Sequence, residues 1–191
     1  MERRGGHRSS VCQQMNKAYW SNFYLSFDES SPSSFAVFCR PYLTGLKVVD
    51  WCCGNGRDTY FLAEACEIVG IDFAVKPEDR GNARFVRCDV KDYMRQMPAP
   101  DVVYCRFALH AVSKEEEEAL LSWGANHLFI ETRINSTEGY YGNHTRRYID
   151  ERELKQRAMG SGYEIVYDEV SHEFSPYRGN KPELLRLMLK Q

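Results

Sequence analysis

The strongest constraint on this chain is its alternation of short apolar runs with helical segments. Five such runs cover residues 46–50, 68–72, 84–88, 101–106 and 127–132. Strands that alternate with helices predict a mostly parallel sheet that helices cover on both faces. Two more strand-like runs follow near the end of the chain, over 163–173 and 184–189.

The intervening segments carry helix signals. Ser113 with Glu116 three residues later forms a capping box, and Asp150 with Glu153 begins a further helix. Ahead of the first strand, aromatic residues at i, i+1, i+4, i+5 and i+8 lie on one helical face. We expect helices over residues 16–27, 33–42, 57–66, 91–97, 113–124 and 150–160.

Length and charge limit the remaining possibilities. A chain of 191 residues is about one domain, and we expect it over 16–191, after a flexible basic arm over 1–15. The 25 basic and 27 acidic residues give a net charge of −2. This near balance argues against binding nucleic acid through overall charge. Nothing in the sequence indicates an oligomeric state.

Cysteine usage and hydropathy bear on the compartment. The seven cysteines are odd in number and scattered, and no C-x2-C pair occurs. This pattern argues against a disulfide framework and against a zinc site. No apolar run reaches the ~18 residues that a membrane span needs. We therefore expect a cytoplasmic protein with no bound metal and no membrane partner.

The turn after the first strand has the composition of a ligand-binding loop. Gly54 and Gly56 follow Asp50 and allow a tight strand-to-helix turn that a ligand can approach closely. A nicotinamide dinucleotide would need a third glycine where Thr59 stands, and Asp58 would repel its pyrophosphate. A nucleoside without phosphate fits this loop better.

Acidic residues also close the next two strands. Asp72, 16 residues after Gly56, is placed to accept hydrogen bonds from both hydroxyls of a ribose. Asp89 could accept from an adenine amino group while Val90 packs on the ring. Asp50, Asp72 and Asp89 at three successive strand ends indicate a cationic or amine-bearing nucleoside.

These motifs, in this order, resemble those of the class I S-adenosylmethionine-dependent methyltransferases. The resemblance covers residues 16–190 and implies a doubly wound α/β fold of the Rossmann-like type, with a seven-stranded, mostly parallel sheet whose last strand is antiparallel. Cys52 stands where the family has its first glycine. The resemblance implies S-adenosyl-L-methionine as cofactor, with these binding residues: Asp50, Cys52, Gly54, Asn55, Gly56, Asp72, Phe73, Asp89, Val90 and Arg106.

Sequence excludes some methyl acceptors and suggests others. No Asn/Asp-Pro-Pro-Tyr/Phe follows the fourth strand, which argues against the enzymes that methylate exocyclic amines of nucleic acids. No Pro-Cys pair occurs, which argues against methylation of base C5. The adjacent Arg146 and Arg147 suit a phosphate or carboxylate acceptor, since guanidinium groups bind such anions bidentately. The candidate catalytic residues are His110, Glu131, Arg133, His144, Arg146 and Arg147.

A second resemblance concerns the acceptor. Arg-Phe-x-Leu-His, Glu-Thr-Arg and His-x-Arg-Arg-Tyr-Ile are similar to compact bacterial and viral methyltransferases that modify surface glycans and their phosphorus-containing decorations. The resemblance implies O-methylation of a small anionic metabolite or glycan component. An RNA methyltransferase that uses the basic arm and the arginines is one alternative, and a catalytically silent cofactor-binding module is another.

The roles of individual residues stay open at this point. His110 and His144 both titrate near neutral pH, so either could be the general base. His110 could instead bond backbone, and Arg146 and Arg147 could form a solvated face.

Overall fold

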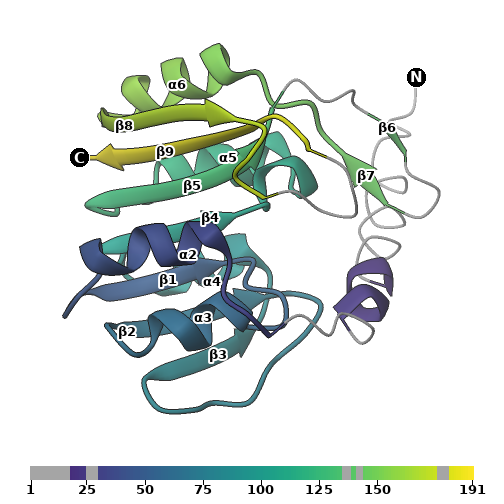
Figure 1. Cartoon of the computed structure of the whole chain (residues 1–191), viewed down its shortest axis with the longest axis vertical. Coiled ribbons are helices and arrows are strands. Elements are labelled where there is room, and N and C mark those ends of the chain that lie inside the picture. The colour runs from purple at the N-terminus through teal and green to yellow at the C-terminus, as the bar shows by residue number, and fades with distance from the viewer. Residues whose placement is uncertain (1–17, 25–29, 135–138, 141–143, 176–180) are drawn as a thin grey trace, which may run out of the picture.

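A computed structural model describes residues 18–24, 30–134, 139–140, 144–175 and 181–191 (Figure 1). The expected arm over residues 1–15 lies outside these ranges. A seven-stranded sheet runs through the molecule in the order β3-β2-β1-β4-β5-β9-β8. Its strands are β1 (Lys47–Trp51), β2 (Glu67–Asp72), β3 (Ala83–Arg87), β4 (Val102–Arg106), β5 (His127–Arg133), β8 (Glu164–Ser171) and β9 (Leu184–Lys190).

The direction of the strands confirms the predicted sheet. Strands β3, β2, β1, β4 and β5 are parallel to one another, and β9 lies antiparallel between β5 and β8. In Figure 1 the arrowhead of β9 accordingly points in the opposite direction to those of the other strands. All seven strands begin and end within two residues of the predicted runs, because short apolar runs, most of them buried on both faces of the sheet, specify them locally.

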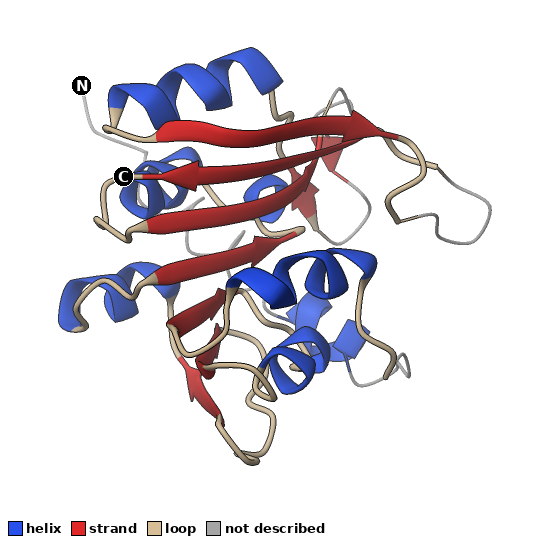
Figure 2. Cartoon of the chain, turned by 60° about the vertical axis from the view of Figure 1, so that its left-hand side comes forward, coloured by secondary structure: helices blue, strands red, loops and turns tan. Residues whose placement is uncertain are grey.

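Helices cover both faces of the sheet (Figure 2). Side chains of β1 alternate between the two layers: Val48 packs with the helices of one face and Val49 with those of the other. The first face carries α2 (Ser34–Cys39), η1 (Arg40–Tyr42) and α3 (Arg57–Leu62), and the second carries α4 (Val90–Gln96), α5 (Lys114–Leu121) and α6 (Glu151–Gly160). This confirms the doubly wound α/β architecture.

Local helix signals mostly hold. The capping box forms as predicted, since Ser113 Oγ accepts from the Glu116 backbone and Glu116 accepts from the Ser113 backbone. Helix α3 ends at Leu62, four residues before the predicted end, and the aromatic segment is helical over the described residues 18–24. A short hairpin that the sequence did not predict pairs β6 (Gly139–Tyr140) with β7 (Thr145–Arg146).

The described residues contain neither a membrane-spanning helix nor a cluster of metal ligands. None of their helices is long and apolar enough to cross a membrane. They also contain no cluster of histidine, cysteine or acidic side chains that could hold a metal ion.

Candidate active site

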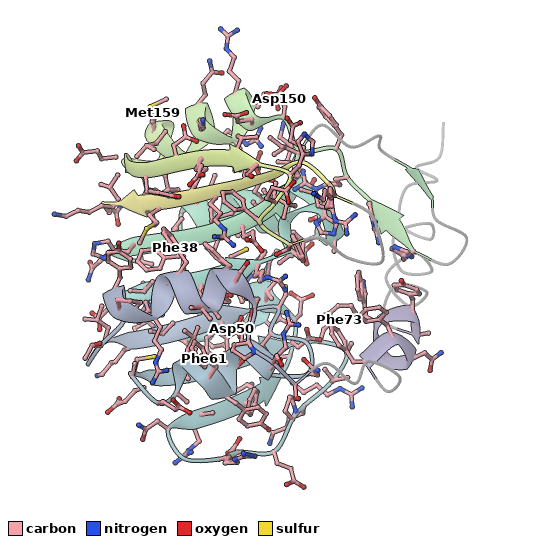
Figure 3. All side chains as sticks on the ribbon, in the orientation of Figure 1. Phe38, Asp50, Phe61, Phe73, Asp150 and Met159 are labelled. Carbon is pink, nitrogen blue, oxygen red and sulfur yellow. The ribbon has the colours of Figure 1, made fainter. Side chains whose placement is uncertain are left out.

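A cavity of about 550 Å³ lies at the carboxyl ends of the parallel strands, beside helical residues 18–24. This is the edge at which open α/β sheets bind ligands, and the volume suits a small molecule. Asp50 lies on the sheet and Phe73 lies beside residues 18–24 (Figure 3). The predicted site residues that line the cavity are Asp50, Cys52, Asn55, Asp72, Phe73, Arg106, His110, Arg133 and Arg146.

Asp72 organises the glycine turn. Its two carboxylate oxygens accept backbone N–H groups of Gly54, at 3.0 Å, and Ala74, at 2.7 Å. Gly54 has φ +56°, and a Cβ there would overlap the ring of Tyr24. The turn therefore needs glycine for its backbone conformation and for the close approach of Tyr24.

Asp58 joins three elements at the wall of the cavity. Its carboxylate accepts from the Ser33 backbone at 2.8 Å, the Ser33 hydroxyl at 2.7 Å and the Tyr104 hydroxyl at 2.8 Å. Ser33 is also the N-cap of α2. Sequence reasoning used Asp58 only to exclude a pyrophosphate and missed this network, because Ser33 and Tyr104 lie 25 and 46 residues away.

Helical residues 18–24 form one side of the cavity. Ser21 Oγ donates to the Ala74 carbonyl at 3.2 Å, and the Tyr19 ring stacks on His144 with centroids 3.9 Å apart. The segment thus connects the loop after β2 with the loop before β7. Tyr19, Trp20, Phe23 and Tyr24 all line the cavity. Their helical spacing was visible in the sequence, but nothing in it indicated which surface they cover.

The far end of the cavity is aromatic and basic. Phe107 follows β4 with φ +54°, a conformation that is unusual for a bulky residue and is often found at functional sites. The guanidinium carbons of Arg106 and Arg133 lie 4.2 Å and 5.6 Å from the centre of its ring. His110 lies beyond, with its ring centroid 6.2 Å from that of Phe107.

The two neighbouring arginines have different surroundings. Arg146 lines the cavity and donates from Nε to His144 Nε2 at 3.1 Å. Arg147 does not line it, and instead donates to the Val112 and Leu109 carbonyls and to the fully buried Glu117. Consecutive residues of an extended chain point to opposite sides, so the structure does not bring both guanidinium groups to one anion.

Glu131 is fully buried and does not line the cavity. Its carboxylate accepts from Arg106 Nε at 2.9 Å and from Arg186 Nε at 2.7 Å. Glu131 therefore positions Arg106, which does line the cavity. Arg186 comes from β9, 55 residues further along the chain, so no local pattern reveals this pair.

Comparison with known proteins agrees with this geometry. Residues 48–128 match the family model described as a methyltransferase domain. These residues therefore form a methyltransferase domain. Its cofactor is S-adenosylmethionine, as the sequence resemblance implied. No curated protein matches the chain.

Solved structures show the methyltransferase fold across the whole chain. The 1,6-didemethyltoxoflavin-N1-methyltransferase of Burkholderia thailandensis, solved with its acceptor and S-adenosylhomocysteine, has a TM-score of 0.75 at 15% identity, covering 100% of this chain and 92% of its own. The glycopeptide N-methyltransferase MtfA has a TM-score of 0.62 at 13% identity, with 84% and 90% covered. The [4+2]-cyclase SpnF has 0.63 at 12%, with 95% and 94% covered.

The acidic end of the cavity has hydrogen-bond acceptors that suit S-adenosylmethionine. Asp50 and Asp72 lie buried at the ends of two adjacent strands, and their carboxylates can accept from hydroxyl or ammonium groups and attract a positive sulfonium. The glycine turn lies beside them, with the ring of Tyr24 packed against Gly54. Asp89 and Val90 lie outside the cavity lining, and Asp89 caps α4 by accepting from the Lys91 backbone at 2.8 Å.

Cys52 has φ +63°, in the left-handed region that favours glycine. At an ordinary position Ala is more stable than Gly. Here we expect the reverse: Cys52→Gly should have a free energy of unfolding about 1 kcal/mol higher than that of Cys52→Ala. Urea unfolding of the two variants measures the difference, and both lack the thiol. A more stable alanine variant would contradict strain at this turn.

Asp50 makes the stability of the methyltransferase depend on pH. Burial is the main cause that raises its pKa to about 7, and Thr59 Oγ1 donates to it at 2.5 Å. The folded chain therefore holds this proton more tightly than the unfolded chain. As pH rises from 4 to 7, Asp50 is ionised in the unfolded chain but still protonated in the folded chain, so the free energy of unfolding falls. We expect wild type to lose ~2–4 kcal/mol relative to Asp50→Asn over that range.

Unfolding of both proteins at several pH values measures this difference, in which the other titrating groups cancel. A constant difference between pH 4 and 7 would show that Asp50 ionises normally in the folded chain.

Proposed function

We propose that this methyltransferase methylates an oxygen of a small anionic acceptor. The observation that carries the proposal is the polarity of the cavity. Asp50 and Asp72 make the end beside the glycine turn acidic, whereas Arg133 and Arg146 make the end around His110 basic. The Asp58 carboxylate lies 3.3 Å from Arg57 and 4.0 Å from Arg106, which also line the cavity. A cationic cofactor suits the acidic end, and an anion suits the basic end.

The choice of oxygen follows from the charge of the acceptor. Groups that are anionic near neutral pH, such as carboxylates, phosphonates and acidic phenols, carry their charge on oxygen. S-adenosylmethionine supplies an electrophilic methyl group: the acceptor oxygen forms the new carbon–oxygen bond, and the electron pair of the broken carbon–sulfur bond stays on sulfur. The protein aligns the two partners.

Two of the similar structures support a small acceptor. One is the 1,6-didemethyltoxoflavin-N1-methyltransferase and the other is the glycopeptide N-methyltransferase MtfA, and both methylate nitrogen. The net charge of −2 also favours a small acceptor over RNA. The [4+2]-cyclase SpnF has the same fold, so this fold hosts other chemistry as well.

Methyl transfer from radiolabelled S-adenosylmethionine tests the proposal. We expect label on at least one member of a panel of carboxylates, phosphonates and phenols, and none on their neutral esters or ethers. Methylation of RNA that weakens steeply with salt would instead establish the RNA enzyme. Cofactor binding by calorimetry, with no transfer to any acceptor, would establish a silent binding module.

A further inference from the structure

His110 is a buried imidazole at the basic end of the cavity. It lies in η2 (Leu109–Ala111), directly after β4, and only 4% of its surface is exposed. Its Nδ1 has no hydrogen-bond partner within the described part of the chain. A histidine that acts as general base is usually oriented by a carboxylate on its second nitrogen. No carboxylate among the described residues bonds to this ring.

The described charged groups that act on His110 most strongly are basic. Arg133 comes from β5 and Arg146 from β7, while His144 and Arg147 flank that strand. The nearby Glu117 is held by Arg147 and Arg157. Burial is the main cause that lowers the pKa of His110 to about 3, and these four groups lower it further. The ring is therefore neutral at physiological pH, and it is a weak base.

No other described group at this end of the cavity can take a proton readily. His144 accepts from Arg146 at Nε2, and burial lowers its pKa as well. The Asp58 carboxylate, 4.0 Å from Arg106, already accepts three hydrogen bonds. Asp50 and Asp72 lie at the ends of β1 and β2 beside the glycine turn, where Asp50 accepts from Thr59 and Asp72 from the Gly54 and Ala74 backbones. An acceptor with a protonated hydroxyl would thus find no efficient base here.

From this arrangement we propose that the acceptor binds as an oxyanion, which has no proton to lose, and that His110 holds it as a neutral hydrogen-bond donor. Arg133 and Arg146 supply the balancing positive charge. Phe107, held by its strained backbone between two guanidinium groups, forms the adjacent wall. This inference rests on the proposed function and defines its substrate class: acceptors that are ionised at neutral pH. His110 is then a positioning residue for the acceptor.

Amide substitutions separate a donor from a base. Asparagine and glutamine can donate from the positions of the two ring nitrogens, but neither can accept a proton at neutral pH. For the acceptor that the methylation panel identifies, we expect His110→Ala to lower kcat/KM roughly 10- to 100-fold. One of His110→Asn and His110→Gln should recover most of that loss. The pH profile of that amide variant between pH 6 and 9 should have the same shape as that of wild type, because the ionisation of Asp50 near pH 7 is common to both.

Two results would overturn the donor role. One is that both amide variants are as slow as His110→Ala although they still bind S-adenosylhomocysteine and unfold at the wild-type temperature. The other is a wild-type rate that rises with pH until a base is deprotonated, in a profile that the amide variants lose.

A binding experiment tests the oxyanion site without methyl transfer. Benzoate and methylphosphonate serve as anionic probes of the protein with S-adenosylhomocysteine, and benzyl alcohol serves as the neutral control. We expect at least one anion to bind to the wild-type protein, whereas the alcohol should not bind. That anion should bind roughly tenfold more weakly, or worse, to Arg133→Ala and to His110→Ala. Failure of both anions, or equal binding of the alcohol, overturns the inference.

The two proposals fail in different ways. Anion binding without any methyl transfer would reject the proposed function and keep the oxyanion site. Methyl transfer with a pH-dependent base would keep the proposed function and reject the oxyanion site.

Discussion

Replacing Glu131 with glutamine should lower the free energy of unfolding by about 3–5 kcal/mol, since it leaves buried arginines without their counter-charge. Glu131 is fully buried, and its two oxygens accept from Arg106 and Arg186 at 2.9 Å and 2.7 Å. A glutamine keeps only one acceptor oxygen and turns an amide N–H₂ toward a guanidinium. The loss should also displace Arg106 from the wall of the cavity.

Urea denaturation measures this effect. Glu64→Gln is the matched control, because Glu64 pairs with Arg40 at an exposed site, where such a pair contributes ~0–1 kcal/mol. A double variant, Glu131→Gln with Arg186→Met, removes one of the buried positive charges that Glu131→Gln leaves without a partner carboxylate. It should be more stable than Glu131→Gln alone. Equal stability losses in the Glu131 and Glu64 variants would show that burial of this cluster adds nothing.

Asp72→Ala should weaken S-adenosylmethionine binding by ~1–3 kcal/mol, or roughly 5- to 150-fold. Asp72 is the last residue of β2 and lines the cavity. We expect its carboxylate to accept hydrogen bonds from the ribose hydroxyls. It also holds the Gly54 and Ala74 backbones, so its removal loosens the glycine turn against which the cofactor is expected to lie.

Calorimetric titration with S-adenosylhomocysteine gives the affinities. Asp89→Ala is the matched variant at the next strand end: it removes the cap of α4 but no cavity wall, and its affinity loss should be smaller. Asp101→Ala controls for the loss of an acid elsewhere, since Asp101 accepts from the Lys47 backbone at the opposite end of β1. Wild-type affinity in Asp72→Ala would remove the ribose assignment.

The sequence by itself determined the backbone elements and the edge of the sheet that binds the cofactor. A short apolar run marks each strand, and the capping box at Ser113 involves residues three apart, so both are local. Acids at the ends of successive parallel strands necessarily meet at one edge. This is why Asp50 and Asp72 were placed correctly at one cavity, while their roles in cofactor binding stay predictions.

The tertiary structure alone decided which side chains meet across that edge. Arg146 lines the cavity whereas Arg147 does not, although the two are neighbours in the chain. Glu131 accepts a hydrogen bond from Arg186, 55 residues further along the chain, and Asp58 accepts one from Tyr104, 46 residues further along. Such contacts depend on strand order and on which way each backbone turns, and hydrophobic periodicity does not encode them. The proposed acceptor chemistry therefore depends on packing, whereas the cofactor edge could be predicted from the strand pattern.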